Sequence, residues 1–153
     1  VAGNGQPGHL DGNSMESEFN CPKGLAFDAD EQLLVADTWN QCIRRLSIDF
    51  STVTTLVGSG TKASYKDGPS LSCHFSFPSS IALDPQGNIY VSDCKNYRIR
   101  RVDMEKNYTS TIAGWTSWHQ REGGFADGPL FRALVGYPHG LLIEGNTIIF
   151  ADC

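Results

Sequence analysis

Short apolar runs that end in an acidic residue recur along the chain. The runs LLVAD (33–37) and IYVSD (89–93) are each followed by a polar turn and then by an alternating run, CIRRLSID (42–49) and RIRRVD (98–103). A third copy begins with IIFADC at 148–153. Short runs of apolar and β-branched residues bounded by turn residues are typical of β-strands. The pattern therefore predicts the same set of strands in each copy.

The sequence pattern of each complete unit predicts four β-strands. Turn residues such as those at 85–88 and 144–146 separate the runs, and no stretch has the period of a helix. Four antiparallel strands joined by short turns form one blade of a β-propeller, so we expect an all-β fold. The predicted strands cover 24–29, 33–37, 42–49 and 52–58 in the first unit, and 79–85, 89–93, 98–103 and 110–114 in the second.

Four sets of markers repeat in step, at intervals of 55 to 60 residues. Intervals of this length with strand-like content indicate propeller blades or another repeat array. The markers are Pro22, Pro78 and Pro138; Asp37, Asp93 and Asp152; Gly3, Gly58 and Gly114; and Asp11-Gly12, Asp67-Gly68 and Asp127-Gly128.

The shared pattern F-x-x-P-x-G-(L/I)-A-x-D, then (L/I)-x-V-(A/S)-D and N-x-x-I-R-R-(L/V), resembles the NHL repeat over nearly the whole chain. The third unit departs from it at Val135, where the others have Phe19 and Phe75. The resemblance implies an NHL-type β-propeller, whose usual complete form has six blades. We expect an incomplete set of about three blades: 1–19 as the outer strand and loop of a preceding blade, 20–75 and 76–134 as full blades, and 135–153 as the first half of a third.

The edges of such a piece would leave unpaired strands. We therefore expect the chain to occur with other blades of the same polypeptide, or with neighbouring copies in a fibre, and not as an isolated monomer.

The acid that ends each second strand is expected to be architectural, because it recurs in every unit. We expect Asp37, Asp93 and Asp152 to accept hydrogen bonds from backbone N–H groups or, in the first two units, from Arg45 and Arg101. A charge-assisted bond of this kind contributes about 1.5–3 kcal/mol. Acid–base catalysis is disfavoured, because no second carboxylate in a different environment accompanies the first.

Binding residues are sought where the units differ. The loop after Gly114 is four residues longer than its counterpart after Gly58. Aromatic, His and Arg side chains on such a loop suit a protein or carbohydrate ligand. The alternative is that the loop folds its tryptophans onto its own blade. The added residues are Trp115, Trp118, His119 and Arg121.

Metal and cofactor chemistry is not expected. The four histidines, His9, His74, His119 and His139, lie at different phases of the repeat and lack the spacing of metal ligands. A net charge of −5 argues against a nucleic-acid partner, and no apolar run is long enough to span a membrane.

The cysteines suggest two disulfides. Cys21 and Cys42 are separated by the same interval as Cys73 and Cys94, and each pair lies at one end of its predicted blade. The alternative is free, buried thiols. Cys153 has no matching partner in its own unit.

An acceptor sequence for N-glycosylation, Asn107-Tyr108-Thr109, falls in a predicted turn. Together with paired cysteines it predicts an extracellular or cell-surface glycoprotein. The function expected from these features is a non-catalytic interaction or structural module. The alternatives are part of an extracellular lyase or lactonase, and an RNA- or protein-binding NHL domain.

Overall fold

The fold is all-β, as the sequence predicts. The computed structural model describes residues 2–60, 62–114, 124–129 and 132–153. None of the described residues forms a helix long and apolar enough to cross a membrane. The strands are β1 (Gly12–Asn13), β2 (Leu25–Phe27), β3 (Leu33–Asp37), β4 (Cys42–Leu46), β5 (Thr52–Val57), β6 (Gly68–Pro69), β7 (Pro78–Leu83), β8 (Ile89–Asp93), β9 (Arg98–Asp103), β10 (Tyr108–Ala113), β11 (Pro138–Glu144) and β12 (Thr147–Asp152).

Each complete blade is an antiparallel sheet of four main strands with a short fifth strand at its outer edge. The orders are β1-β5-β4-β3-β2 and β6-β10-β9-β8-β7. β1 pairs with β5 through Gly12 and Asn13, so these two residues of the segment 1–19 belong to the sheet of the first blade. The sequence analysis did not predict β1 and β6, because a strand of two residues has no detectable period.

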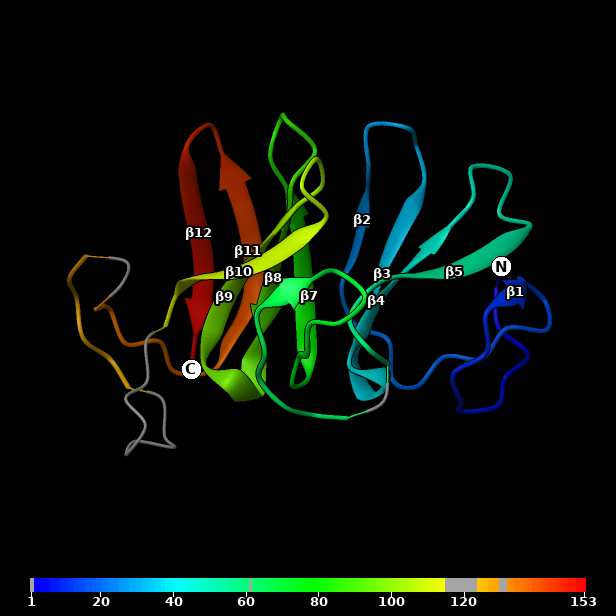
Figure 1. The fold of residues 1–153 in the computed structure, drawn as a ribbon, viewed down its shortest axis with the longest axis horizontal. Coiled ribbons are helices and arrows are strands. Elements are labelled where there is room, and N and C mark those ends of the chain that lie inside the picture. Colours follow the sequence, from blue (N-terminus) through cyan, green and yellow to red (C-terminus); the bar gives the residue numbers. More distant parts are fainter. Residues whose placement is uncertain (1, 61, 115–123, 130–131) are drawn as a thin grey trace.

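The blades stand side by side, and β11 and β12 form a hairpin at the other end of the row from the N-terminus (Figure 1). Neighbouring blades contact each other through their inner strands, β2 with β7 and β7 with β11. Side-chain hydrogen bonds reinforce these contacts: Thr38 Oγ1 donates to the carbonyl of Pro78 at 2.8 Å, and Ser92 Oγ donates to the carbonyl of His139 at 2.7 Å.

The main core lies between the first and second blades. Alternation along each strand sends one set of side chains to each face of the sheet, so both faces of a blade contribute to packing. The interface is closed by Leu34, Ala36, Ile43, Val57, Cys73, Phe75, Ile81, Ile89, Val91 and Val102, all buried. Ile99, Ala113 and Val135 begin a second interface, between the second and third blades.

One apolar face of the first blade remains open. Ile81 pairs with Val91, as Leu25 pairs with Val35, so the two residues are equivalent. Ile81 is 5% exposed beneath its neighbour, whereas Leu25 is 62% exposed. A cavity of about 390 Å³ on this face is lined in part by Phe19, Leu25 and Val35. The open face of the first blade is therefore equivalent to the face of the second blade that packs against the first.

A single 3-10 turn joins the second and third strands of each complete blade. These turns, η1 (Thr38–Asn40) and η2 (Cys94–Asn96), lie at the same end of the molecule, below the sheets in Figure 1. Each ends at a residue with left-handed backbone, Gln41 (φ 57°) and Tyr97 (φ 57°).

Candidate functional site

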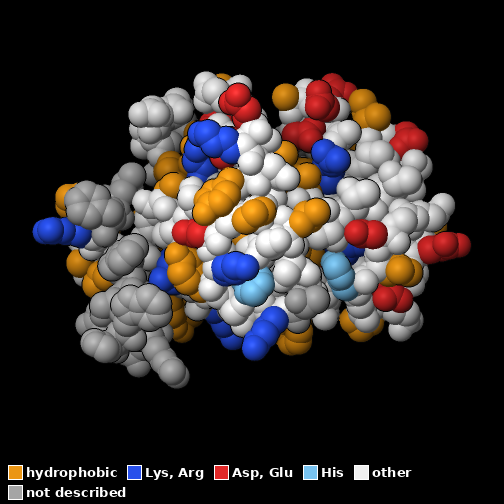
Figure 2. All heavy atoms as spheres, viewed as in Figure 1, with side chains coloured by type: hydrophobic (Ala, Val, Ile, Leu, Met, Phe, Trp, Pro, Cys, Tyr) orange, Lys and Arg blue, Asp and Glu red, His pale blue; other side chains and the backbone are white. Residues whose placement is uncertain are grey.

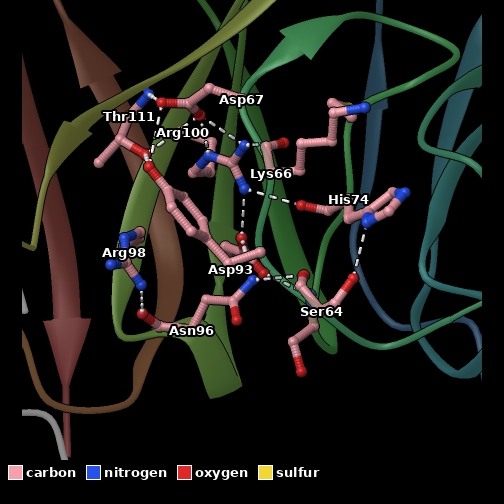
Figure 3. A network of polar contacts seen from close by, with 12 residues as sticks. Ser64, Lys66, Asp67, His74, Asp93, Asn96, Arg98, Arg100 and Thr111 are labelled. Carbon is pink, nitrogen blue, oxygen red and sulfur yellow. Dashed lines mark hydrogen bonds and ion pairs between the residues drawn. The ribbon is translucent and has the colours of Figure 1, made fainter. Parts of the chain in front are cut away.

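The acid at the end of the second strand is part of a buried ion network, shown for the second blade in Figure 3. Arg100, on β9, lies between Asp93 at the end of β8 and Asp67 in the loop before β6. Its Nη1 is 2.6 Å from Asp93, and its Nη2 is 2.6 Å from Asp67. Arg100 and Asp93 are fully buried. The network therefore ties the loop that precedes β6 to the centre of the blade.

Every N–H of the guanidinium of Arg100 has an acceptor. Besides the two carboxylates, Nη1 donates to the carbonyl of His74 and Nη2 to the carbonyl of Lys66, each at 3.0 Å. Nε also donates to Asp67, at 3.1 Å. A planar group with five donors suits such a site, which lysine with its single nitrogen could not fill.

The carboxylate of Asp93 is equally well bonded. It accepts from the backbone N–H of Ser76 at 2.6 Å and from Asn96 Nδ2 at 2.8 Å, in addition to Arg100. Burial raises the pKa of Asp93, and Arg100 and these donors act against that rise. Burial alone would lower the pKa of Arg100, but the carboxylates of Asp93 and Asp67 raise it on balance, so the arginine stays charged.

The first blade repeats the arrangement with Arg44. Its Nη1 is 2.9 Å from Asp37 and its Nη2 is 2.6 Å from Asp11. Its Nε also donates to Asp11, at 2.9 Å, and its other N–H groups donate to the carbonyls of Glu18 at 3.0 Å and Leu10 at 2.8 Å. Asp37 also accepts from the backbone N–H of Asn20 at 2.8 Å.

The arginine partners expected from the sequence were wrong by one residue. Arg44 and Arg100 enter the networks, whereas Arg45 is half-buried and Arg101 lies 3.4 Å from Asp103. Successive side chains of a strand point to opposite faces, so only one arginine of each Arg-Arg pair can reach the acid. The Arg-Arg motif alone does not show which of its two arginines reaches the acid.

Asp152 occupies the same place in the third blade. One of its carboxylate oxygens accepts from the backbone N–H of Gly136 at 2.8 Å, as Asp93 accepts from Ser76. The other oxygen is buried and has no hydrogen-bond partner within the described part of the chain.

The cysteines form no disulfide in the structure, contrary to the expected pairs Cys21–Cys42 and Cys73–Cys94. All five are free thiols; Cys21 and Cys153 are exposed, and the other three are buried. The partners of each expected pair face different neighbours. Cys73 donates to the carbonyl of Ser70 at 3.2 Å, whereas Cys94 Sγ lies 3.9 Å from His139 in the third blade. Equal spacing in sequence therefore does not place the two sulfurs of an expected pair within bonding distance.

Burial also suppresses thiol chemistry. It raises the pKa of Cys42, Cys73 and Cys94, so these groups stay protonated near neutral pH. Cys42 Sγ lies 3.7 Å from His9 Nε2, but His9 also lies 3.1 Å from Thr55 Oγ1. Among the described residues, no group of three or more His, Cys, Asp or Glu side chains is placed to hold a metal ion.

A second cluster lies on the end of the molecule that carries η1 and η2. Trp39 packs edge-on against Phe77, with ring centroids 6.1 Å apart, and Lys95 Nζ lies 4.1 Å from the centre of the Phe77 ring. Tyr97 and Tyr137 pack in the same manner at 5.0 Å, with their hydroxyls 3.1 Å apart. We call Trp39, Phe77, Tyr97 and Tyr137 the aromatic row. It extends across the ends of all three blades.

The aromatic row occupies positions at which the repeat units differ. Phe77 and Tyr137 each precede the proline that opens a unit, where the first unit has Cys21. Tyr97 stands where the first unit has Gln41, whose Oε1 accepts from the backbone N–H of Phe77 at 2.7 Å. Sequence analysis missed these residues because it looked for inserted segments. Comparison of the units position by position would have shown them.

The other expected site residues do not join this cluster. Trp115, Trp118, His119 and Arg121 lie outside the described residues. Asn107 lies in the exposed turn between β9 and β10, at the other end of the blade, with left-handed backbone (φ 51°). On the face viewed in Figure 1, acidic side chains gather mainly over the first blade and basic ones over the rest (Figure 2).

Comparison with known proteins identifies the repeat. The family model described as NHL repeat matches residues 19–46 and 75–102. The chain is 33% identical over 105 residues to Protein SUPPRESSOR OF QUENCHING 1, chloroplastic, of Arabidopsis thaliana, a match that covers 69% of this chain and 10% of that protein. It is 27% identical over 124 residues to NHL repeat-containing protein 2 of Homo sapiens, covering 80% of this chain and 16% of that protein. The chain thus spans a small part of these relatives.

Solved structures show the same fold. A protein of unknown function from Bacteroides thetaiotaomicron superposes with a TM-score of 0.78 at 24% identity, covering 86% of this chain and 32% of that one. A gluconolactonase from Xanthomonas campestris (TM-score 0.58, 17% identity) matches over 86% of this chain and 34% of that one. Virginiamycin B lyase from Staphylococcus aureus (TM-score 0.53, 16% identity) matches over 89% and 38%. At these identities the likeness establishes the fold alone.

Proposed function

Because the chain belongs to the NHL-repeat β-propellers, we propose that it is a non-catalytic interaction module that binds a protein partner on the aromatic row. The observation that carries this proposal is that two exposed aromatic rings of the row, those of Trp39 and Tyr137, lie at the same end of the molecule. Trp39 is 57% exposed and Tyr137 is 43% exposed. Exposed Trp and Tyr side chains are enriched among the residues that dominate protein–protein affinity.

The aromatic row is held rigidly enough to bind without large reordering. Phe77 is fixed by its backbone bond to Gln41 and by the ring of Trp39, and Tyr97 by its contact with Tyr137. Rigid side chains lose little conformational entropy on binding, which favours affinity. The cation of Lys95 beside Phe77 adds a charge that suits an acidic partner segment.

The buried groups that could perform catalysis support the non-catalytic part of the proposal. Asp37 and Asp93 are bonded to an arginine, an asparagine and a backbone N–H, and they are fully buried. A carboxylate that is buried away from solvent and hydrogen-bonded to protein groups on both oxygens is poorly placed to exchange protons with a substrate.

Site-specific photo-crosslinking in the full-length protein tests the proposal. A photoreactive residue at position 39 should capture a partner that the same residue at position 108 does not. Tyr108 is the control because it is 46% exposed but lies beside the turn at the opposite end of its blade. The affinity of the captured partner should fall at least tenfold with Trp39→Ala or Tyr137→Ala, and stay unchanged with Tyr108→Ala. Equal losses for all three variants would contradict a site on the aromatic row.

We also propose that the open face of the first blade receives another blade of the same polypeptide. The equivalence of Leu25, which is exposed, and Ile81, which is buried against a neighbouring blade, supports this proposal.

We further propose that the protein is extracellular or exposed at the cell surface. The exposed turn at Asn107 supports this location. Mass spectrometry of the protein from its natural source should find an N-glycan on Asn107. An unmodified Asn107 peptide at full occupancy would argue against this location.

A further inference from the structure

Tyr97 and Tyr137 form a pair of phenols that joins the second blade to the third. Tyr97 directly follows the turn η2, and Tyr137 directly precedes β11. Their rings pack edge to face, with centroids 5.0 Å apart and planes inclined by 70°, and their hydroxyl oxygens lie 3.1 Å apart. The hydroxyl-bearing ends of the two rings therefore meet at the boundary between the blades.

The backbone holds both rings in this arrangement. The N–H of Tyr97 donates to the carbonyl of Cys94 at 3.2 Å and fixes the left-handed turn (φ 57°). The N–H of Tyr137 donates to the carbonyl of Cys153 at 3.1 Å, and its carbonyl accepts from the N–H of Cys153 at 3.4 Å. Two groups held in contact within one molecule react as if each were present at a very high concentration.

The boundary between the first and second blades shows that the fold does not require two phenols here. Gln41 occupies the position of Tyr97, and Phe77 occupies that of Tyr137. Gln41 Oε1 accepts from the backbone N–H of Phe77 at 2.7 Å, so this contact forms without a hydroxyl on either side. A hydrogen bond between two hydroxyls that water can reach adds little stability. Packing of the blades therefore does not explain why both residues at the second boundary are tyrosines.

The other three tyrosines are placed differently. Tyr65 Oη donates to Asp67 and Tyr90 Oη donates to Asp84, each at 3.2 Å. Tyr108 is 46% exposed near the opposite end of its blade. Within the described residues, which include all five tyrosines, no other tyrosine ring packs against a second tyrosine.

We propose that Tyr97 and Tyr137 are a site of oxidative cross-linking, at which hydrogen peroxide and a haem peroxidase join them as dityrosine. Each phenol loses one electron and one proton. The two phenoxyl radicals then form a carbon–carbon bond between ring carbons next to the hydroxyls, and the hydrogen on each of these carbons moves to the phenolic oxygen. One hydrogen peroxide takes up the two electrons and two protons and becomes two water molecules.

The new bond ties the second blade to the third. A covalent link between positions 97 and 137 restricts the unfolded chain, as a disulfide does, and so stabilises the folded pair of blades. It also fixes the ring of Tyr137 within the aromatic row. The reaction needs no partner on that row, so it is independent of the proposed binding function.

Peroxidase treatment of the full-length protein tests this site. Exposed thiols such as Cys21 and Cys153 are alkylated beforehand, because thiols reduce phenoxyl radicals. Peptide mapping by mass spectrometry should find dityrosine that joins positions 97 and 137, at least tenfold more abundant than dityrosine at position 108. Its yield should not change on dilution, because both rings belong to one molecule. Absence of this product, or its loss on dilution, would overturn the proposal.

Matched variants supply a second readout. Tyr97→Phe and Tyr137→Phe keep a ring at each position but remove one hydroxyl, and each should abolish the joined product. Tyr108→Phe should change its yield less than twofold. Oxidation should raise the urea midpoint of the unaltered protein but not that of Tyr97→Phe, which cannot form the link. An equal shift in both proteins would mean that no bond ties the two blades together.

Discussion

At the scale of single residues, the buried arginines Arg44 and Arg100 are the centres of the ion networks. Each neutralises two acids that come from distant parts of the chain, and each donates to two backbone carbonyls. Removing one partner of a buried ion pair leaves a charge without compensation, which costs far more than the pair contributes.

Arg100→Gln should therefore destabilise the protein by about 3–5 kcal/mol, because the fully buried Asp93 loses its counter-charge. Arg101→Gln should cost less than about 1 kcal/mol, since its pairing with Asp103 is partly exposed. Urea unfolding of the two variants beside the unaltered protein measures the difference. Similar midpoints for both variants would show that the network does not hold the blade.

At the scale of elements, the strands could be predicted from the sequence more fully than the site. The runs at 33–37 and 89–93 coincide with β3 and β8, because short β-branched runs between turn residues leave little choice of structure. The choice of Arg44 over Arg45 depends on the face of a strand, and the contact of Tyr97 with Tyr137 depends on how two blades meet. Neither is encoded in local spacing.

The connection that leads from β5 to the second blade requires a glycine at position 58. Gly58 has a left-handed backbone (φ 95°), and a Cβ there would lie 2.7 Å from the carbonyl oxygen of Gln41. Gly87 has a similar φ of 81° but nothing within 4 Å of a Cβ. Gly87→Ala should cost about 1–2 kcal/mol from the backbone alone. Gly58→Ala should cost clearly more, and thermal unfolding that ranks the two in the opposite order would refute the steric argument.

The turn between β4 and β5 is expected to weaken in acid. Hydrogen bonds from Ser47 and Ser51 lower the pKa of Asp49 from 3.8 to about 2. A carboxyl whose pKa is lowered by folding stabilises the protein above its unfolded pKa, and this contribution is lost as the pH falls through the folded pKa. The free energy of unfolding should thus drop between about pH 4 and pH 2, and drop less in Asp49→Asn. Parallel pH curves for the two proteins would contradict this assignment.

For the whole molecule, the stability of each blade depends on the blade beside it. Ile81 and Leu25 are equivalent, yet only Ile81 is covered. Ile81→Ala should cost about 2–5 kcal/mol in this chain. Leu25→Ala should cost less than about 1 kcal/mol, because exposed positions contribute little. In a longer polypeptide with a blade on the open face, urea unfolding should show that Leu25→Ala becomes as costly as Ile81→Ala; a cost that stays small would mean that no blade packs there.

The ion network also sets an order of events during synthesis on the ribosome. Asp11 emerges 33 residues before Arg44, and Asp67 emerges 33 residues before Arg100. At about 5–20 residues per second, each acid waits about 2–7 seconds for its counter-charge. The ion network of a blade thus cannot form until its third main strand is nearly complete, and blades mature one after another as the chain is made.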